Sequence, residues 1–353
     1  MRTERSWQTL LAGSITTAGA LAAALPVDRD AVARVAARYP MRVNPYVLSL
    51  IRSPDDPWWR QAIPDLRELD ADAAVTPDPT GEEAQSPSSR IVHRYPDRVV
   101  FLVSDSCALY CRHCMRKRMV GKNHGVAEAE IDAGIACIRD CHAVREVILS
   151  GGDPLLLSDD RLSDILKRIR SIPHVDVIRI HTRIPGVLPA RVTAALSAML
   201  GRFHPLYVNI QFNHPDELTS EAEAACKNLA DAGIPLGSQT VLLKGINDDP
   251  PTMMRLMQRL LKNRIRPYYL HHADPVAGTG HFRTGLAAGL RILRHLQGRL
   301  SGMGIPRYMI DLPNGGGKVP VSPDYISRKT KKILVVENYL GECFDYPILL
   351  KNH

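Results

Sequence analysis

Six short apolar segments, separated by long amphipathic stretches, dominate the middle of the chain. They are RVVFLVS (98–104), EVILSGG (146–152), VDVIRIHT (175–182), LYVNIQF (206–212), LGSQTVLL (236–243) and RPYYLHH (266–272). Because helical stretches such as 128–140 and 220–233 lie between them, the segments indicate parallel strands joined by crossover helices. The sequence therefore predicts an α/β fold, a parallel sheet curved into a partial (βα)6 barrel. In such a sheet, chemistry lies at the carboxyl ends of the strands.

The regions on either side are predicted to extend this core. Asp28 and Asn44 are suited to cap two helices before the first strand. The segment VTPDPTGEEAQSPSSR (75–90) has the composition of an exposed linker or strap. The expected units are a helical N-terminal region with its linker (1–92), a core (93–304) and a C-terminal segment (305–353).

Composition bears on partners and compartment. Lys plus Arg exceed Asp plus Glu by 45 − 37 = 8, but the basic residues are spread along the chain, so nucleic acid is not expected. Seven cysteines, three of them within eight positions, favour a reducing, cytoplasmic compartment over a secreted disulfide framework. Residues 10–25 end in small residues much as a secretory signal does, but an amphipathic helix fits them equally well. No apolar stretch is long enough to span a membrane.

Three cysteines, Cys107, Cys111 and Cys114, follow the first predicted strand. Zinc usually takes four ligands from two loops, and His113, the nearby candidate, lies in the tight turn between two of the cysteines. Three thiolates instead suit three corners of a 4Fe–4S cube and leave one iron open. A third interpretation is that the three cysteines are ordinary residues of the hydrophobic core, but the basic residues beside them would then have to be buried too. The spacing therefore favours an iron–sulfur cluster.

The motif C-x3-C-x2-C, followed by SGGDPL after the second strand, resembles the radical S-adenosylmethionine superfamily. More closely, residues 93–121 and the segment GHFRT…DLPNGGGKVPVSPDY (280–325) resemble the lysine 2,3-aminomutase family. The resemblance runs from about Trp7 to about Tyr325. It implies a radical S-adenosylmethionine barrel with a C-terminal segment that carries a pyridoxal phosphate lysine. It also implies an isomerase that converts L-lysine to β-lysine, reduced by a carrier of the flavodoxin or ferredoxin type.

For S-adenosylmethionine, the resemblance implies that the open iron binds its amino and carboxylate groups and that an electron from the cluster cleaves it. The residues expected around it are Gly151, Gly152, Asp153, His113 and Gln239. Two glycines let a backbone approach a ligand closely, and a carboxylate offers charge to an ammonium. Gln211 stands where relatives often carry His, so it receives no cofactor role.

Lys318 follows three glycines in PNGGGK. A Walker phosphate loop would need Ser or Thr after the lysine, where Val319 stands, and a flexible turn with a solvated lysine is the other reading. The resemblance implies instead that Lys318 holds pyridoxal phosphate covalently and acts in catalysis. Arg94, Tyr95 and Arg98 are expected at its phosphate, on one extended segment whose alternate residues face one ligand. Arg94 and Arg98 could otherwise form exposed pairs with Asp97.

Arg116 matches the family arginine that holds the substrate carboxylate, and Asp274 and Asp311 match the positions that contact the far end of the substrate. Two carboxylates there favour a cationic side chain over glutamate. Either carboxylate could instead cap a helix or pair with Arg283 or Arg307. Lys117 and Arg118 are expected only to be solvated.

Alternatives remain for the substrate and the activity. They are a lysine on a protein such as elongation factor P, free arginine, and a non-enzymatic iron–sulfur electron carrier or structural module, which would have no use for Lys318. The C-terminal tail offers only Cys343 where clostridial-type enzymes carry a cysteine cluster for zinc between subunits. Zinc is therefore not expected, and the chain is either a monomer or a homo-oligomer.

Overall fold

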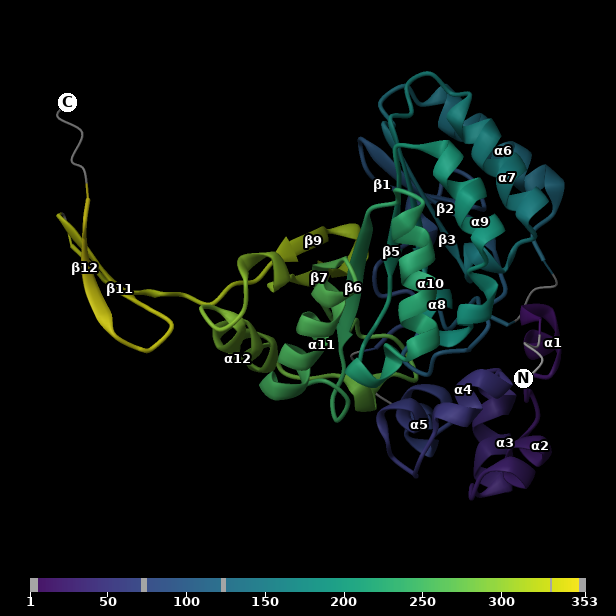
Figure 1. The fold of residues 1–353 in the computed structure, drawn as a ribbon, viewed down its shortest axis with the longest axis horizontal. Coiled ribbons are helices and arrows are strands. Elements are labelled where there is room, and N and C mark those ends of the chain that lie inside the picture. Colours follow the sequence, from purple (N-terminus) through teal and green to yellow (C-terminus); the bar gives the residue numbers. More distant parts are fainter. Residues whose placement is uncertain (1–5, 71–74, 122–124, 331, 349–353) are drawn as a thin grey trace.

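The computed structural model describes residues 6–70, 75–121, 125–330 and 332–348 (Figure 1). Its centre is a sheet of nine strands that follow one another in chain order. They are β1 (Ile91–Tyr95), β2 (Arg98–Ser104), β3 (Glu146–Gly151), β4 (Val177–Thr182), β5 (Leu206–Ile210), β6 (Leu236–Leu242), β7 (Ile265–His272), β8 (Arg307–Leu312) and β9 (Gly317–Pro320). Neighbours from β2 to β8 are parallel, and β1 and β9 are antiparallel at the edges. The predicted barrel fold is confirmed, with the six expected strands as β2 to β7.

The sheet runs on beyond the six expected strands. β8 pairs in parallel with β7, and β9 returns antiparallel along β8. Residues 307–320 thus belong to the same sheet as the core, although they lie in the C-terminal segment of the sequence. This continuity brings the PNGGGK turn to the carboxyl end of the barrel.

Helices connect successive strands and cover the outside of the sheet (Figure 1). They are α6 (Glu128–Asp140), α7 (Asp159–Arg170), α8 (Ile184–Val187), α9 (Ala194–Leu200), α10 (Ser220–Asp231), α11 (Pro250–Lys262) and α12 (Leu286–Leu296). In α7, buried Leu162, Ile165 and Ile169 recur at helical spacing, whereas its charged residues lie on the opposite face. Burial of such apolar stripes against the strands forms the core.

The N-terminal helices form a layer that packs on one end of the barrel (Figure 1). They are α1 (Trp7–Ala12), α2 (Ala18–Ala24), α3 (Arg29–Arg38), α4 (Pro45–Leu50), α5 (Pro57–Ala62) and the 3-10 turn η1 (Leu66–Leu69). Asp28 and Asn44 cap α3 and α4 as predicted. The amphipathic helix expected at 10–25 is instead split into α1 and α2, because Ile15 pairs its backbone with Val43. Within the described residues, no helix is long and apolar enough to cross a membrane.

The segment 75–90 is a packed strap and not an exposed linker. Thr76 forms a bridge with Val276, and the Asn314 amide donates to the Pro79 carbonyl at 3.3 Å. Thr80 and Glu82 are buried within it, next to the short turn η2 (Glu83–Gln85). Its proline-rich composition therefore reflects an extended path across the barrel mouth.

The last described residues form a second, separate sheet that projects away from the barrel (Figure 1). Its antiparallel strands are β10 (Ile326–Lys329), β11 (Ile333–Glu337) and β12 (Cys343–Pro347). Aromatic side chains on this sheet, including Phe344 and Tyr346, are exposed. The sheet takes no part in the site described below.

Candidate active site

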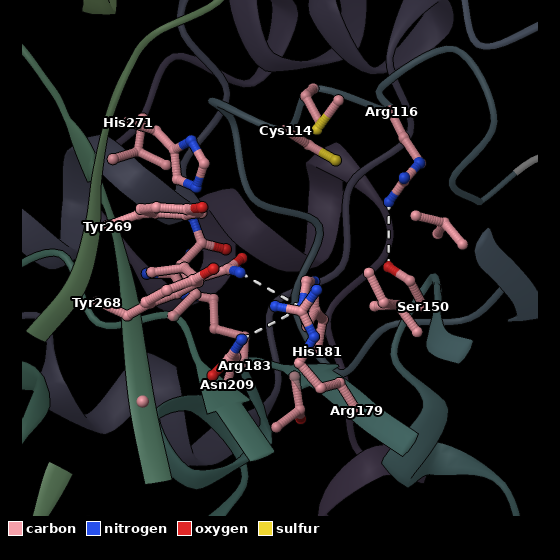
Figure 2. Close-up of a pocket in the computed structure, with 18 of the residues that line it drawn as sticks. Cys114, Arg116, Ser150, Arg179, His181, Arg183, Asn209, Tyr268, Tyr269 and His271 are labelled. Atoms are coloured by element: carbon pink, nitrogen blue, oxygen red, sulfur yellow. Dashed lines mark hydrogen bonds between the residues drawn. The ribbon is translucent and has the colours of Figure 1, made fainter. Parts of the chain in front are cut away.

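The barrel encloses one large cavity of 1230 Å³ (Figure 2). Its lining runs along the strands from their first residues, such as Arg98 and Leu236, to their carboxyl ends, and it includes the loop after β2, Glu82 of the strap and Lys318 of β9. Every residue that the sequence assigned to the site lies on this wall: Arg94, Tyr95, Arg98, Cys107, Cys111, His113, Cys114, Arg116, Gly151, Gly152, Asp153, Gln239, Asp274, Asp311 and Lys318. The fold thus gathers residues from positions 94 to 318 around a single space.

The three cysteines lie on the loop after β2, and all are free thiols. Burial and the neighbouring Cys111 thiolate raise the pKa of Cys114 to about 11. Thiols in such a position need nearby positive charge before they ionise, and iron supplies it. No group of His, Cys, Asp or Glu surrounds one metal-ion position in the described ranges. A 4Fe–4S cube binds each thiolate through a different iron, so this donor set suits a cluster better than a single zinc ion.

Gly151 and Gly152 hold the cysteine loop against β3. The amide of Gly152 donates to the Ser104 carbonyl at 2.5 Å, and a Cβ on Gly152 would lie 2.3 Å from the Ser106 carbonyl oxygen. Gly151 has a φ of +119°, and a Cβ there would lie 2.3 Å from the Ser104 carbonyl oxygen. The close backbone approach predicted for a ligand is therefore made by the protein's own cysteine loop.

Asp153 joins the ends of β3 and β4. Its carboxylate accepts hydrogen bonds from Thr182 Oγ1 at 2.8 Å and from the Arg183 amide at 2.7 Å. Burial raises the pKa of Asp153 to about 6, although these donors favour its ionised form. The carboxylate expected to face an ammonium is therefore already occupied by structural hydrogen bonds.

At the other side of the cavity, Lys318 and Asp311 meet across β8 and β9. Lys318 Nζ donates to Asp311, and Arg94 Nη1 lies 3.2 Å from the same carboxylate. The Lys318 amide donates to the Tyr95 hydroxyl at 2.7 Å. The alternative prediction, that Asp311 forms a salt bridge with Arg283 or Arg307, is wrong because the Asp311 carboxylate points into the barrel.

Arg94 and Arg98 differ in their surroundings. They stand on either side of the turn between β1 and β2, so the single extended segment expected for them is a hairpin. Arg94 donates to Gln85 Oε1 at 2.8 Å and to the Thr80 carbonyl at 2.9 Å. Arg98 pairs with exposed Asp97 at 2.6 Å, as the alternative reading had it, although its side chain also lines the cavity.

Arg116 is held from two sides. Glu82 Oε1 accepts from Arg116 Nη2 at 2.7 Å, and Ser150 Oγ lies 3.1 Å from Nη1 (Figure 2). The two neighbouring cations expected to be solvated are also paired. Lys117 is buried with its Nζ 2.6 Å from Glu68, and Arg118 contacts Glu82 at 3.2 Å. The sequence contained no local signal for these pairs, because their carboxylates lie far away along the chain.

Several further polar residues line the cavity that sequence reasoning missed (Figure 2). Arg183 Nη1 lies 2.7 Å from Cys111 Sγ. The amide of Asn209 lies 3.4 Å from His181 Nε2, as does that of the expected site residue Gln239 at 3.3 Å, and burial lowers the pKa of His181 well below its usual value. His271 lies 4.0 Å from Asp311. The missed residues lie at or just after the carboxyl ends of β4, β5 and β7, and that position in parallel strands was the available signal.

Comparison with known proteins agrees with this arrangement. The family model for the radical SAM superfamily matches residues 101–257, and the model described as lysine-2,3-aminomutase matches residues 293–348. An L-lysine 2,3-aminomutase of Acetoanaerobium sticklandii is 44% identical over 91% of this chain and 78% of its own length. The chain belongs to the lysine 2,3-aminomutase family. An L-lysine 2,3-aminomutase of Clostridium subterminale is 42% identical over 96% of this chain and 83% of its own length.

This aminomutase family also includes a glutamate 2,3-aminomutase of Clostridioides difficile, which is 42% identical over 89% of this chain and 75% of its own length. Overall sequence identity therefore does not distinguish members of the family that act on lysine from one that acts on glutamate. Membership of the radical S-adenosylmethionine superfamily brings a 4Fe–4S cluster and S-adenosylmethionine, and the aminomutase family depends on pyridoxal phosphate. These enzymes are isomerases, as the sequence predicted.

Proposed function

We propose that this aminomutase acts on free L-lysine and moves the amino group from carbon 2 to carbon 3 to give β-lysine. The observation that carries the proposal is the pair of carboxylates, Asp274 and Asp311, on the wall of the cavity that Arg116 also lines. An arginine suits the substrate carboxylate and two carboxylates suit a distal ammonium. A substrate with a distal carboxylate would meet like charge in a closed site.

Asp311 is paired with Lys318 in the present structure. Lys318 Nζ would hold pyridoxal phosphate in the loaded enzyme, so its ion pair with Asp311 describes the protein without the cofactor. Arg94 remains beside Asp311 at 3.2 Å and offsets only part of the acidic charge. Asp274, close enough to Asp311 for that charge to raise its pKa, adds a second carboxylate, and the pair supports a cationic substrate side chain.

We assign the remaining residues as follows. Cys107, Cys111 and Cys114 would hold the cluster, and the residues that would hold S-adenosylmethionine are Gly151, Gly152, Asp153, His113 and Gln239. Arg94, Tyr95 and Arg98 face the phosphate of pyridoxal phosphate, which supplies a conjugated ring system able to delocalise an unpaired electron. His113 supports the assignment, because its Nδ1 is buried and has no partner among the described residues.

The partners and compartment also belong to the proposal. Radical S-adenosylmethionine enzymes need a reductant, and we assign a flavodoxin or ferredoxin type carrier in the cytoplasm, where cluster thiolates stay reduced. The exposed β10–β12 sheet supports a homo-oligomer, because its aromatic side chains lie in the open.

The test is anaerobic reconstitution with iron, sulfide, pyridoxal phosphate, S-adenosylmethionine and dithionite, followed by chromatographic resolution of α- and β-amino acids. Lysine and β-lysine have equal mass, so the isomers must be separated. We expect β-lysine from lysine and no isomer from glutamate or arginine. Cleavage of S-adenosylmethionine without any isomerised free amino acid would instead indicate a protein-bound lysine as the substrate.

A second measurement addresses the non-enzymatic alternative. Borohydride reduction of the loaded protein, followed by peptide mapping, is expected to give a pyridoxyl adduct on Lys318. Absence of that adduct would contradict the aminomutase proposal and favour an electron carrier.

A further inference from the structure

The strap across the barrel mouth contacts two arginines of the cavity wall. Glu82 binds Arg116, whereas Thr80 and Gln85 bind Arg94. Glu82 precedes Arg116 by 34 residues in the sequence, whereas Thr80 and Gln85 precede Arg94 by 14 and 9 residues. The strap therefore orients groups that other parts of the chain supply.

The contacts around Arg116 use three of its five N–H donors. Nε and Nη2 face the Glu82 carboxylate at 3.1 and 2.7 Å, and Nη1 donates to Ser150 Oγ at 3.1 Å. One N–H on each terminal nitrogen remains, and Arg116 lines the cavity. Two remaining donors on adjacent nitrogens match the two oxygens of a carboxylate.

Glu82 is well placed to fix the Arg116 side chain. It is buried, with 4% of its surface exposed, and Arg118 contacts its second oxygen at 3.2 Å. Burial favours the neutral acid, but the two guanidinium groups lower the pKa of Glu82 overall. The strap itself is anchored, because the Gln85 side chain donates to the Thr80 carbonyl at 3.0 Å and to the Gly81 carbonyl at 2.8 Å.

We propose that Glu82, together with Ser150, is a positioning residue that aims the free donors of Arg116 at the substrate carboxylate. The inference rests on the proposed function, because it takes Arg116 as the carboxylate-binding group. The opposite possibility is that Glu82 occupies the place of the substrate carboxylate and must leave before the substrate binds. The two possibilities predict opposite changes in substrate affinity. Loss of a positioning residue weakens substrate binding, whereas loss of a competitor strengthens it.

The test compares Glu82→Gln with Glu83→Gln in the reconstituted enzyme. Glu83 is the matched control, because it contacts the same Arg118 but its side chain is 77% exposed and does not touch Arg116. We expect Glu82→Gln to raise the KM for L-lysine at least about tenfold, the equivalent of one charge-assisted hydrogen bond. The Glu83→Gln enzyme is expected to keep the KM and kcat of the unchanged protein.

Competitive inhibition by L-lysinamide separates positioning from general damage. This analogue keeps both amines but lacks the carboxylate, so its inhibition constant is expected to be the same in Glu82→Gln and the unchanged protein. Glu82→Asp, which keeps the charge, is expected to recover part of the lost affinity for lysine. Equal weakening of lysine and lysinamide, or a KM for lysine that is unchanged or lower, would overturn the proposal.

Arg116→Met distinguishes this inference from the proposed function on which it rests. If Arg116→Met raises the KM for lysine but Glu82→Gln does not, the role of Glu82 is wrong and the carboxylate assignment stands. If neither variant changes the ratio of lysine to lysinamide binding, the assignment of Arg116 fails, and the inference about Glu82 fails with it. Iron content and thermal midpoint, measured for each variant, confirm that the compared proteins are folded and loaded.

Discussion

Asp311 and Lys318 stand directly opposite each other on the antiparallel strands β8 and β9, and Lys318 Nζ donates to the Asp311 carboxylate. Side chains at directly opposed positions lie close enough to interact whatever the surrounding loops do. The turn between them is tight because Asn314 and Gly315 adopt positive φ values of 53° and 83°. The register of a hairpin therefore sets the spacing between the proposed cofactor lysine and a proposed substrate contact.

Substrate binding should depend on the ionisation of Asp274. Burial, and then the like charge of Asp311, raise the pKa of Asp274 to about 7. Below this pH the carboxyl is protonated in the free enzyme and cannot pair with an ammonium. We therefore expect kcat/KM for lysine to rise as pH increases through about 7.

The pH profile of kcat/KM between pH 5.5 and 8.5 checks this expectation. Asp311→Asn removes the like charge and should move the midpoint to lower pH. Asp274→Asn should remove the inflection altogether and lower kcat/KM at every pH. The same inflection in Asp274→Asn would show that another group controls the profile.

The cysteine loop should be less stable without Glu68. This fully buried carboxylate pairs with Arg112 at 2.5 Å and with Lys117 at 2.6 Å, so Glu68→Gln leaves two buried cations with too little countercharge. Breaking a buried ion pair costs about 3–5 kcal/mol. Urea unfolding of the cluster-free protein measures the change in the free energy of unfolding.

Asp176→Asn is the control for Glu68→Gln. Asp176 pairs with Arg145 on the surface, and such exposed pairs contribute about 1 kcal/mol or less. Equal losses of stability in the two variants would contradict the anchoring role of Glu68.

Gly152→Ala should impair cluster assembly. Its new methyl group would lie 2.3 Å from the Ser106 carbonyl oxygen, and because that oxygen belongs to the backbone, the cysteine loop must move. Overpacking of this kind costs about 1–3 kcal/mol. We expect less iron bound per chain after reconstitution, measured by a colorimetric iron assay, whereas Gly285→Ala, with open space around its Cβ, should bind iron normally. Full iron loading in Gly152→Ala would refute the steric argument.

Arg183 should influence the reduction potential of the cluster. Its guanidinium lies 2.7 Å from Cys111 Sγ, and a buried cation beside a thiolate favours the more negative, reduced cluster. A hydrogen bond to a charged group contributes about 1.5–3 kcal/mol, so Arg183→Met should lower the one-electron potential by roughly 60–130 mV. Spectroscopic redox titration measures the potential.

Arg191→Met provides the comparison for Arg183→Met, because Arg191 is also buried but donates to the backbone carbonyls of Leu155 and Leu157 and pairs with Asp159. The reduction potential of the cluster in Arg191→Met should match that in the unchanged protein. A potential for Arg183→Met equal to that of Arg191→Met would show that the contact has no electronic effect.

Much of the fold was predictable because its signals are local. Apolar runs of strand length, helix caps at Asp28 and Asn44, and the cysteine spacing are each written within a few consecutive residues. The rule that chemistry lies at the carboxyl ends of parallel strands then placed the candidate residues on one side of the barrel. These predictions needed only local periodicity and one general property of parallel sheets.

The partners of buried charges were not predictable in the same way. Glu68 and Glu82 look like ordinary surface carboxylates in the sequence, yet each is buried against cations from distant segments. A buried charge is tolerated only where the fold brings a partner to it, and that pairing depends on how the strap, the helical layer and the barrel pack together. The amino-acid sequence specified the elements and the reactive side chains, whereas packing between distant segments settled which charges face each other and where the cavity lies.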